Sequence, residues 1–260
     1  MPILEVNNLT KSFGGIDAVT DISLDIDAGD IVGIIGPNGA GKTTFFNLLT
    51  GLYTPSSGEI VYNLNNRVTT RDLKPHRMTS YGISRTFQNI RLFQDMSVMD
   101  NVLIGFHSGL RYGVPSALLR LPSYFKSENR TYKATDKLLD RFNLLDKKYE
   151  SAKNLPYGDQ RKLEIARALA ASPRLLLLDE PAAGMNPRET SELMELIRWI
   201  RKEFELTIIL IEHDMSLVMN ICKKVFVFDY GNLIASGTPD EVQQDEKVIR
   251  AYLGEEVEKC

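Results

Sequence analysis

A glycine-rich loop between an apolar run and a helical pattern constrains this fold more than any other feature. The segment matches G-x-x-x-x-G-K-[ST], and its members are Gly36, Pro37, Asn38, Gly39, Ala40, Gly41, Lys42, Thr43 and Thr44. Glycines let the backbone curl so that successive N–H groups point at phosphate oxygens. The loop therefore predicts a nucleoside triphosphate site, in which Lys42 contacts the β- and γ-phosphates and the Thr43 hydroxyl ligates Mg²⁺.

The residues on either side of this loop read as a strand and a helix. Ile31 to Ile35 is an apolar run typical of a buried strand. Thr44 to Thr50 is rich in apolar residues, and Gly51 follows as a plausible helix stop. A helix that starts at Lys42 would aim the positive end of its dipole at a bound phosphate. Strand, loop and helix in this order is the setting that the motif requires.

Helical and strand patterns alternate from about residue 160 onward. Arg161 to Ala171 reads as a helix, and the apolar runs Leu175 to Leu178 and Leu206 to Ile211 read as strands. Between them, Asn186 and the proline and glutamate that follow it are typical of a helix start. This alternation predicts an α/β fold, a P-loop NTPase core with a mainly parallel sheet.

Other segments predict antiparallel strands. Alternation from Ile22 to Ile26 and again from Gly58 to Tyr62 indicates half-exposed strands, and hence an antiparallel β subdomain beside the phosphate loop. Near the end of the chain, Val225 to Phe228 and Leu233 to Ala235 flank a turn and predict a hairpin.

We expect a single nucleotide-binding domain over residues 1–260. Residues 1–88 and 160–260 would form the α/β core with its antiparallel β subdomain, and about 89–159 would form an inserted helical subdomain. A helical pattern from Lys133 to Phe142 supports the insertion. A chain of 260 residues that is 43% hydrophobic is long enough for a large core and more than one lobe.

Polar residues follow two of the predicted parallel strands. Asp179 and Glu180 come directly after Leu175 to Leu178, and His213 comes shortly after Leu206 to Ile211. In an open α/β sheet, ligands bind beyond the carboxyl ends of the strands. Asp179 is therefore placed to hold Mg²⁺, directly or through water, and Glu180 to polarise an attacking water.

A short segment before the helix at Arg161 completes a family pattern. It reads Leu155-Pro156-Tyr157-Gly158-Asp159-Gln160-Arg161. It resembles the signature of ABC-type ATPases, the nucleotide-binding domains of ABC transporters, which usually reads Leu-Ser-Gly-Gly-Gln. The resemblance covers nearly the whole chain. It implies that Tyr157, Gly158 and Asp159 contact the γ-phosphate of ATP bound to the opposite subunit, at a helix N-terminus.

Two residues of this segment depart from the family pattern. Pro156 replaces the usual serine, which removes a hydroxyl and an N–H donor. Asp159 stands in the first helical turn, where a carboxylate suits the helix dipole but not a neighbouring phosphate. We still expect Gly158 and the helix start to contact the γ-phosphate.

The same resemblance implies roles for three further residues. Gln88, inside Arg85 to Phe93, is similar to the glutamine that meets Mg²⁺ or water and the membrane subunit. His213 is similar to the switch histidine that contacts the γ-phosphate. Phe13 is similar to the aromatic residue that stacks on adenine, with a core phenylalanine as the alternative.

Within this family the chain most resembles the ATP-binding subunits of branched-chain amino acid importers. Six stretches carry the likeness: Arg85 to Phe93, Met96 to Val102, Leu163 to Leu169, Ala182 to Pro187, Ile211 to Met215 and Val248 to Gly254. It implies an ATPase that uses ATP and Mg²⁺ to energise solute transport, as a peripheral subunit at the cytoplasmic face of the cell membrane. The implied partners are transmembrane permease subunits, a second ATP-binding subunit, homologous or identical, and indirectly a substrate-binding protein.

Three related functions stay open as alternatives. Urea importers and the lipopolysaccharide-export ATPase share much of the pattern. A soluble ABC ATPase that serves no transporter is the third, but such proteins usually carry long coiled-coil insertions or two ATPase domains. This chain has one predicted domain and no heptad run.

Apolar residues follow Gln88 more densely than a free loop requires. They are Ile90, Leu92, Phe93, Met96, Val98 and Met99. Two hypotheses account for them. They form part of a groove that receives a short helix from a membrane subunit, or they pack the helical lobe onto the core.

Charge, cysteines and termini bound the partners and the location. A formal net charge of −3 does not favour broad nucleic-acid binding, and we expect no nucleic-acid partner. Cys222 and Cys260 lie far apart, which predicts free thiols in a reducing compartment. Met1 to Glu5 lacks the features of a signal peptide. No apolar run approaches the about 20 residues that span a bilayer, so we expect another chain to supply any span.

Overall fold

The computed structural model describes residues 2–106 and 122–253, which divide into two compact units. The first unit contains the residues up to Arg85 and those from Arg174 onward, and the second runs from Thr86 to Pro173. The helical subdomain expected over about 89–159 falls within the second unit, and its boundaries stay a prediction. Cys260 lies outside the described residues.

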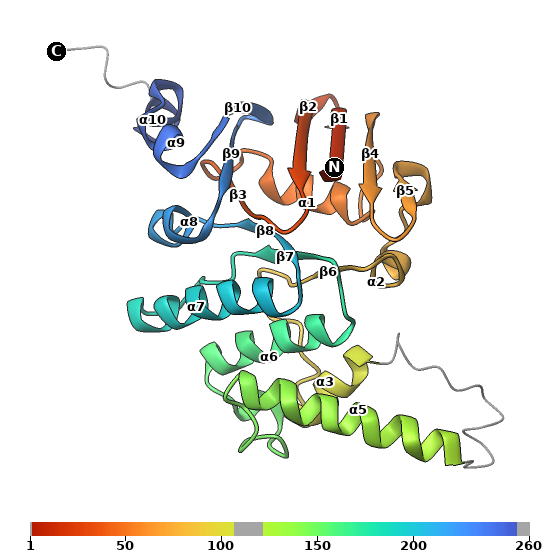
Figure 1. The fold of residues 1–260 in the computed structure, drawn as a ribbon. Helices are drawn as coiled ribbons and strands as arrows, with labels where there is room; N and C mark the ends of the chain where they lie inside the picture. The colour runs from red at the N-terminus through yellow and green to blue at the C-terminus, as the bar shows by residue number, and fades with distance from the viewer. Residues whose placement is uncertain (1, 107–121, 254–260) are drawn as a thin grey trace. The chain divides into compact units, whose positions relative to one another are not determined.

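A six-stranded sheet organises the first unit (Figure 1), with the strand order β10-β9-β3-β8-β7-β6. The strands are β3 (Ile31–Ile35), β6 (Ile83–Arg85), β7 (Leu175–Asp179), β8 (Thr207–Ile211), β9 (Lys224–Asp229) and β10 (Asn232–Gly237). Neighbours from β9 to β6 pair in parallel, whereas β10 pairs antiparallel with β9. The mainly parallel sheet and the C-terminal hairpin are thereby confirmed.

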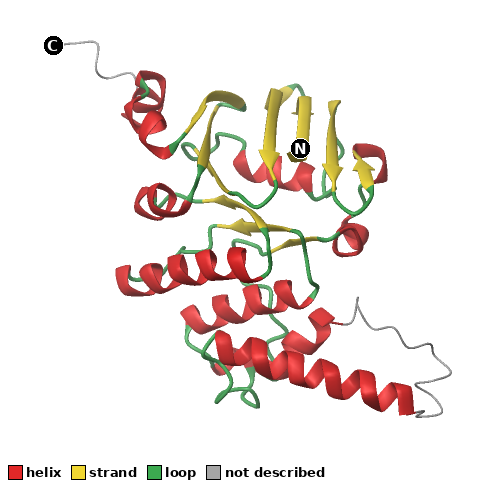
Figure 2. Ribbon diagram, viewed as in Figure 1, coloured by secondary structure: helices red, strands yellow, loops and turns green. Residues whose placement is uncertain are grey.

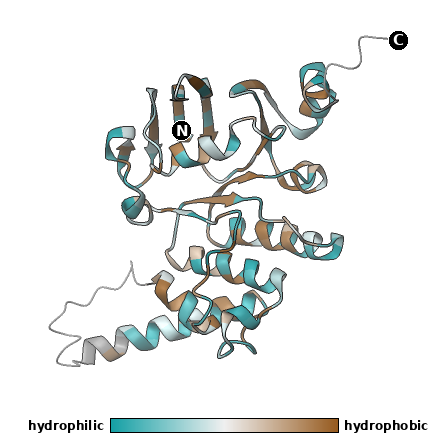
Figure 3. Ribbon diagram, turned by 180° about the vertical axis from the view of Figure 1, so that it is seen from behind, coloured by the Kyte–Doolittle hydropathy of each residue, from teal (hydrophilic) through white to brown (hydrophobic). Residues whose placement is uncertain are grey.

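Continuous apolar runs explain why three strands lie at the centre of this sheet. Every residue of β3, β7 and β8 is buried. A parallel strand that is covered on both faces needs apolar side chains pointing both ways, so its sequence does not alternate. Figure 3 shows these strands as largely hydrophobic.

Helices connect several strands of the first unit, and two more follow its last strand (Figure 2). They are α1 (Lys42–Leu49), α2 (Met78–Tyr81), α7 (Pro187–Glu203), α8 (Met215–Ile221), α9 (Pro239–Gln244) and α10 (Glu246–Leu253), with 3-10 turns at Thr70–Asp72 and Pro75–Arg77. The start of α7 is as predicted. The Asn186 side chain accepts hydrogen bonds from the backbone N–H groups of Arg188 and Glu189, and Glu189 accepts one from Asn186 N.

The antiparallel sheet of the first unit has the order β2-β1-β4-β5. Its strands are β1 (Pro2–Phe13), β2 (Ile16–Asp27), β4 (Ser57–Asn63) and β5 (Arg67–Thr69). Along β2 the apolar side chains of Ile22, Leu24 and Ile26 are buried, and the residues between them are exposed, as the alternation predicts. These side chains share one core cluster with Phe45 and Phe46 of α1.

Among its described residues, the second unit contains the helices α3 (Val98–Phe106), α5 (Pro122–Arg141) and α6 (Tyr157–Ala170), with a 3-10 turn at Ala152–Asn154. α3 packs against α6 at Gly105, where a Cβ atom would lie 2.4 Å from the carbonyl oxygen of Arg167. α6 begins at Tyr157, four residues before the helix predicted from Arg161, because Pro156 supplies the extended residue that precedes a helix.

α5 has 20 residues but is mostly hydrophilic (Figure 3). Throughout the described ranges, no helix combines the length and the apolar character needed to cross a membrane.

Candidate nucleotide site

The glycine-rich loop joins β3 to α1, as the motif predicts. Gly36 and Gly41 have positive φ angles of 147° and 97°. A Cβ atom on Gly36 would lie 2.0 Å from Phe228 O, and one on Gly41 would lie 2.4 Å from Ala18 O. Both positions therefore require glycine for space as well as for conformation. No side chain caps the start of α1, so its first N–H groups suit an anion.

Lys42 is held on this loop by two carbonyl oxygens. Its Nζ donates to Gly36 O at 2.7 Å and to Pro37 O at 2.8 Å. Burial lowers the pKa of Lys42, while the negative charge of Glu180 acts in the opposite direction. A phosphate at the loop would add a strong partner for the charged form of the lysine.

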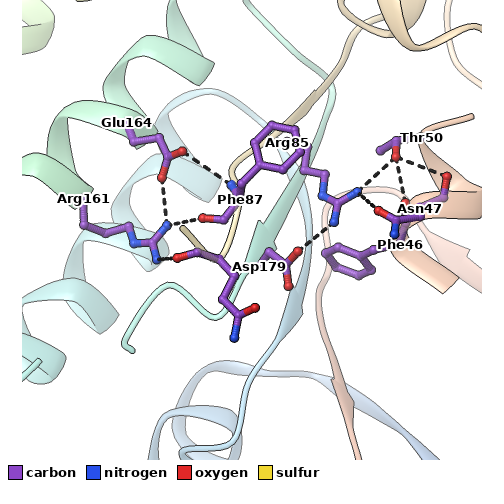
Figure 4. A network of polar contacts seen from close by, with 9 residues as sticks. Phe46, Asn47, Thr50, Arg85, Phe87, Arg161, Glu164 and Asp179 are labelled. Atoms are coloured by element: carbon purple, nitrogen blue, oxygen red, sulfur yellow. Dashed lines mark hydrogen bonds and ion pairs between the residues drawn. The ribbon is translucent and has the colours of Figure 1, made fainter. Parts of the chain in front are cut away.

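Asp179, the last residue of β7, forms a buried ion pair with Arg85, the last residue of β6 (Figure 4). Arg85 Nη2 lies 2.7 Å from Asp179 Oδ2. Arg85 Nη1 donates to Asn47 Oδ1 at 2.8 Å and to Thr50 Oγ1 at 3.1 Å. The arginine thus joins the end of β7 to the helix that follows the phosphate loop. No sequence pattern predicts this role of Arg85, because its partner depends on the pairing of β6 with β7.

Glu180 and His213 meet beyond the carboxyl ends of β7 and β8. Nε2 of His213 lies 2.7 Å from Oε1 of Glu180. The two strands are parallel neighbours with Asp179 beside Ile211, so the residues that follow them lie close together. Glu180 has a φ of 47°, a left-handed conformation that is uncommon outside glycine and occurs at functional sites.

Sequence reasoning missed Glu212, which joins the loops that carry these two residues. Its Oε1 accepts a hydrogen bond from Ala182 N at 2.7 Å, and its Oε2 accepts one from His213 N at 3.1 Å. Burial raises the pKa of Glu212, and its backbone hydrogen bonds act against that rise. The available signal was a carboxylate directly after the apolar run of β8.

Phe13 ends β1 and is exposed over 42% of its surface, so the alternative of a core phenylalanine is wrong. Its ring meets Tyr53 edge-on, with 5.2 Å between ring centroids. Lys11 Nζ lies 4.9 Å from the centroid of the Phe13 ring. An exposed aromatic ring supported at its edge suits stacking on a planar base.

The signature segment of the second unit forms the first turn of α6. Pro156 precedes the helix, which has no side-chain cap, and Tyr157 is 44% exposed. Asp159 Oδ2 lies 2.7 Å from Lys147 Nζ. Hydrogen bonding to Asp159 raises the pKa of Lys147. The carboxylate that ill suits a phosphate is therefore partly neutralised within its own unit.

The loop that carries Gln88 also belongs to the second unit. The carbonyl oxygen of Gln88 accepts a hydrogen bond of 2.8 Å from Arg161 Nη2. Farther along, Val98 and Met99 are buried, whereas Phe93 is 49% exposed and Met96 37% exposed. Neither hypothesis for the apolar segment therefore accounts for all of it.

The oxygen donors of the first unit suit Mg²⁺. Thr43 is exposed in the first turn of α1, and Asp179 contributes a carboxylate at the end of β7. Mg²⁺ prefers hard oxygen ligands and keeps several waters, so one or two protein ligands are enough. Within residues 2–106 and 122–253, no group of three or more His, Cys, Asp or Glu residues could hold a metal ion. The donor set thus fits a hydrated ion bound with phosphates.

Comparison with known proteins identifies the family. A family model described as "ABC transporter" matches residues 19–183, and one described as "Branched-chain amino acid ATP-binding cassette transporter" matches residues 232–258. The chain is 46% identical over 254 residues to the high-affinity branched-chain amino acid transport ATP-binding protein LivG of Salmonella typhimurium, covering 98% of each. It is 34% identical to the lipopolysaccharide export system ATP-binding protein LptB of Escherichia coli, covering 98% of this chain and 99% of LptB.

Solved structures agree with these sequence matches. The crystal structure of a nucleotide-free ATP-binding cassette from an ABC transporter superposes with a TM-score of 0.82 and 31% identity. The match covers 98% of this chain and 100% of the other. The expected fold class, a P-loop NTPase core with antiparallel and helical parts, is therefore confirmed. The chain belongs to the ABC transporter family, as one of its ATP-binding cassettes.

Proposed function

We propose that this chain is the ATP-binding and ATP-hydrolysing subunit of a transporter that imports branched-chain amino acids. The observation that carries the hydrolytic role is the 2.7 Å contact between Glu180 and His213, in the unit that also forms the phosphate loop. Hydrolysis needs a group that orients and deprotonates water, whereas binding alone does not. The likeness to LivG and the family match at residues 232–258 support the solute class.

The nucleotide would be bound at its two ends by different parts of the first unit. The phosphates would lie on the loop from Gly36 to Thr44, and adenine would stack on Phe13. Lys42 would exchange its contacts with the loop carbonyls for the β- and γ-phosphates. The uncapped start of α1 and the exposed ring of Phe13 support this arrangement.

The proposed reaction is attack of water on the γ-phosphorus of ATP, with cleavage of its bond to the β–γ bridging oxygen and release of ADP and inorganic phosphate. Glu180 would orient this water and accept its proton. In the tautomer that carries a proton on Nε2, His213 donates to Glu180 and, once ATP is bound, to a γ-phosphate oxygen. Mg²⁺, when bound to Thr43, Asp179 and Gln88 directly or through water, would neutralise charge on the phosphates.

A second ATP-binding subunit, homologous or identical, would complete each site. Tyr157, Gly158 and Asp159 would contact ATP held by that subunit. The ion pair between Asp159 and Lys147 supports this contact, because it reduces repulsion between the carboxylate and phosphate. Pro156 removes one donor from the contact, and Gly158 with the start of α6 would supply the remainder.

The chain would act as a peripheral subunit at the cytoplasmic face of the membrane, bound to permease subunits. The exposed side chains of Phe93 and Met96 support a docking surface for a short permease helix. A substrate-binding protein would contribute indirectly, by delivering the solute to the permease.

Lipopolysaccharide export is the second candidate, because LptB is also similar over the whole chain. The higher identity to LivG, 46% against 34%, favours the importer. The match of residues 232–258 to a branched-chain amino acid family model also favours it.

Crosslinking and co-purification from membranes test the proposal. Wild type and Glu180→Gln would be isolated with ATP, since a hydrolysis-deficient variant should accumulate the ATP-closed complex. We expect a permease and an ATP-binding subunit to be crosslinked more strongly in the variant. Glu195→Gln, an exposed carboxylate on α7, is the matched control and should behave as wild type. Recovery of soluble partners alone would contradict a transport role, and recovery of lipopolysaccharide-export components would replace the importer.

A further inference from the structure

Two charged residues of α6 form an ion pair in the interior of the second unit. Arg161 Nη1 lies 2.8 Å from Glu164 Oε2, and their side chains are only 0% and 2% exposed. Removing two charges from water is costly, and a buried ion pair is often no more stable than apolar residues of similar size. Stability alone is therefore a weak reason for this pair.

The pair holds the backbone of the loop that contains Gln88 (Figure 4). Arg161 Nη1 donates to Phe87 O at 2.7 Å, and Nη2 donates to Gln88 O at 2.8 Å. From the other side, Glu164 Oε1 accepts from Arg91 N at 3.2 Å and from Phe87 N at 3.5 Å. Charged groups thus bind both carbonyl and N–H groups of one short loop.

These contacts take the place of regular secondary structure. The loop from Thr86 to Ser97 contains no helix or extended strand, so its polar backbone groups need partners outside any helix or sheet ladder. Hydrogen bonds to ionised groups are stronger than those between neutral groups, and a guanidinium fixes two acceptors in one plane. The pair therefore specifies where the backbone of Gln88 lies relative to α6.

We infer that Arg161 and Glu164 are positioning residues for ATP hydrolysis, which clamp the Gln88 loop to the helix that begins with the signature segment. The inference rests on the proposed role of Gln88. Because α6 starts at Tyr157, the clamp makes the signature turn and the Gln88 loop parts of one body. A displacement of one would then displace the other.

The test replaces both charges at once. Arg161→Met alone would leave a buried, unpaired carboxylate, which is strongly destabilising by itself. Arg161→Met with Glu164→Leu removes the clamp without leaving a buried charge. Arg161→Lys keeps the positive charge but not the planar pair of donors, so it should retain part of the clamp.

The assay is ATP hydrolysis by the full chain in its transporter complex. We expect the double variant to lower kcat on the order of 10- to 100-fold, as small misplacements of a catalytic group do, with KM for ATP within about twofold of wild type. The kcat of Arg161→Lys should lie between those of wild type and the double variant. When the double variant is combined with Gln88→Ala, kcat should fall little below that of Gln88→Ala alone, because both changes remove the same function.

The matched control removes another ion pair from the same unit. Lys148 Nζ lies 2.8 Å from Asp136 Oδ1 at a more exposed site. Lys148→Met with Asp136→Leu makes the same change in charge and should leave kcat unchanged.

Four results separate the possible failures. An unchanged kcat in a folded double variant overturns the clamp, and so does a loss that multiplies fully with that of Gln88→Ala. If Gln88→Ala itself has wild-type activity, the role proposed for Gln88 fails and the clamp fails with it. Absence of ATP hydrolysis by the wild-type complex would instead contradict the proposed function.

Discussion

Each unit of this chain contains a buried arginine–carboxylate pair. The arginine of one pair contacts side chains, and the arginine of the other also contacts backbone carbonyls. Arg85 with Asp179 lies in the first unit, and Arg161 with Glu164 lies in the second. Arg85 orients side chains, namely Asp179, Asn47 of α1 and Thr50, the residue directly after α1. Arg161 instead holds the backbone carbonyls of the Gln88 loop.

The difference follows from what each site must fix. In the first unit, the sheet and α1 already place the backbone, so only the direction of a carboxylate remains to be set. In the second unit, the Gln88 loop has no ladder of its own, so its backbone course has to be fixed by side chains. The same residue types thus orient the Asp179 carboxylate in the first unit and hold the Gln88 loop in the second.

The largest effect should separate a catalytic carboxylate from a positioning one. Glu180→Gln should lower kcat by about 10²- to 10⁴-fold, because it removes the proton acceptor. Glu164→Gln should lower it by roughly tenfold, because the amide keeps the shape but loses the charge that holds the loop. Steady-state ATPase assays compare the two, with ATP binding measured separately. Equal losses of kcat in the two variants would contradict the distinction between a catalytic and a positioning carboxylate.

The next effect concerns stability and should be shared by both pairs. Arg85→Met should lower the free energy of unfolding by about 3–5 kcal/mol, because it leaves the Asp179 carboxylate buried without its guanidinium. Adding Asp179→Leu should recover most of that loss. Urea denaturation measures both values. A stable single variant would mean that the Asp179 carboxylate is solvated or otherwise paired in the folded chain.

A smaller effect should separate the pairs again, through Mg²⁺. Thermal stabilisation by ATP should depend on Mg²⁺ in wild type and in Arg161→Met with Glu164→Leu. It should be nearly independent of Mg²⁺ in Arg85→Met with Asp179→Leu, because that variant lacks the carboxylate that we propose binds Mg²⁺. Thermal melts with ATP, with and without Mg²⁺, provide the measurement. The reverse pattern would assign the metal to the second unit.

The smallest effect concerns Glu212, the buried carboxylate between the loops of Glu180 and His213. Burial raises its pKa above the ordinary value, so folding favours its protonated form. Its contribution to stability is therefore greatest below about pH 4.3, the ordinary value, and is lost as pH rises through the folded-state pKa. As the pH rises through this range, the melting temperature should fall less steeply for Glu212→Gln than for wild type. Parallel curves would contradict the raised pKa.

Much of the first unit could be predicted from sequence, because its signals are local. The phosphate loop has a fixed spacing, and Asp179, Glu180 and His213 each follow an apolar run. Parallel strands present their carboxyl ends at one edge of the sheet, which brings residues that follow neighbouring strands close together. Glu180 and His213 are such a pair, with 2.7 Å between His213 Nε2 and Glu180 Oε1.

The remaining contacts depend on pairings that sequence patterns do not carry. Arg85 meets Asp179 only because the three-residue β6 lies beside β7. Arg161 and Glu164 are three positions apart on a helix, where a surface ion pair is the usual expectation. That they face inward became evident only from the course of the Gln88 loop, which follows no periodic pattern.

Transport by a reconstituted complex tests the central claim most directly. The chain, its permease, its partner ATP-binding subunit and the substrate-binding protein would be placed in vesicles, with labelled leucine outside and ATP on the side of this chain. We predict ATP-dependent leucine uptake by wild type and none by Glu180→Gln. Uptake that is equal with and without ATP, or with Glu180→Gln in place of wild type, would contradict the assignment of this chain as the ATPase that drives import.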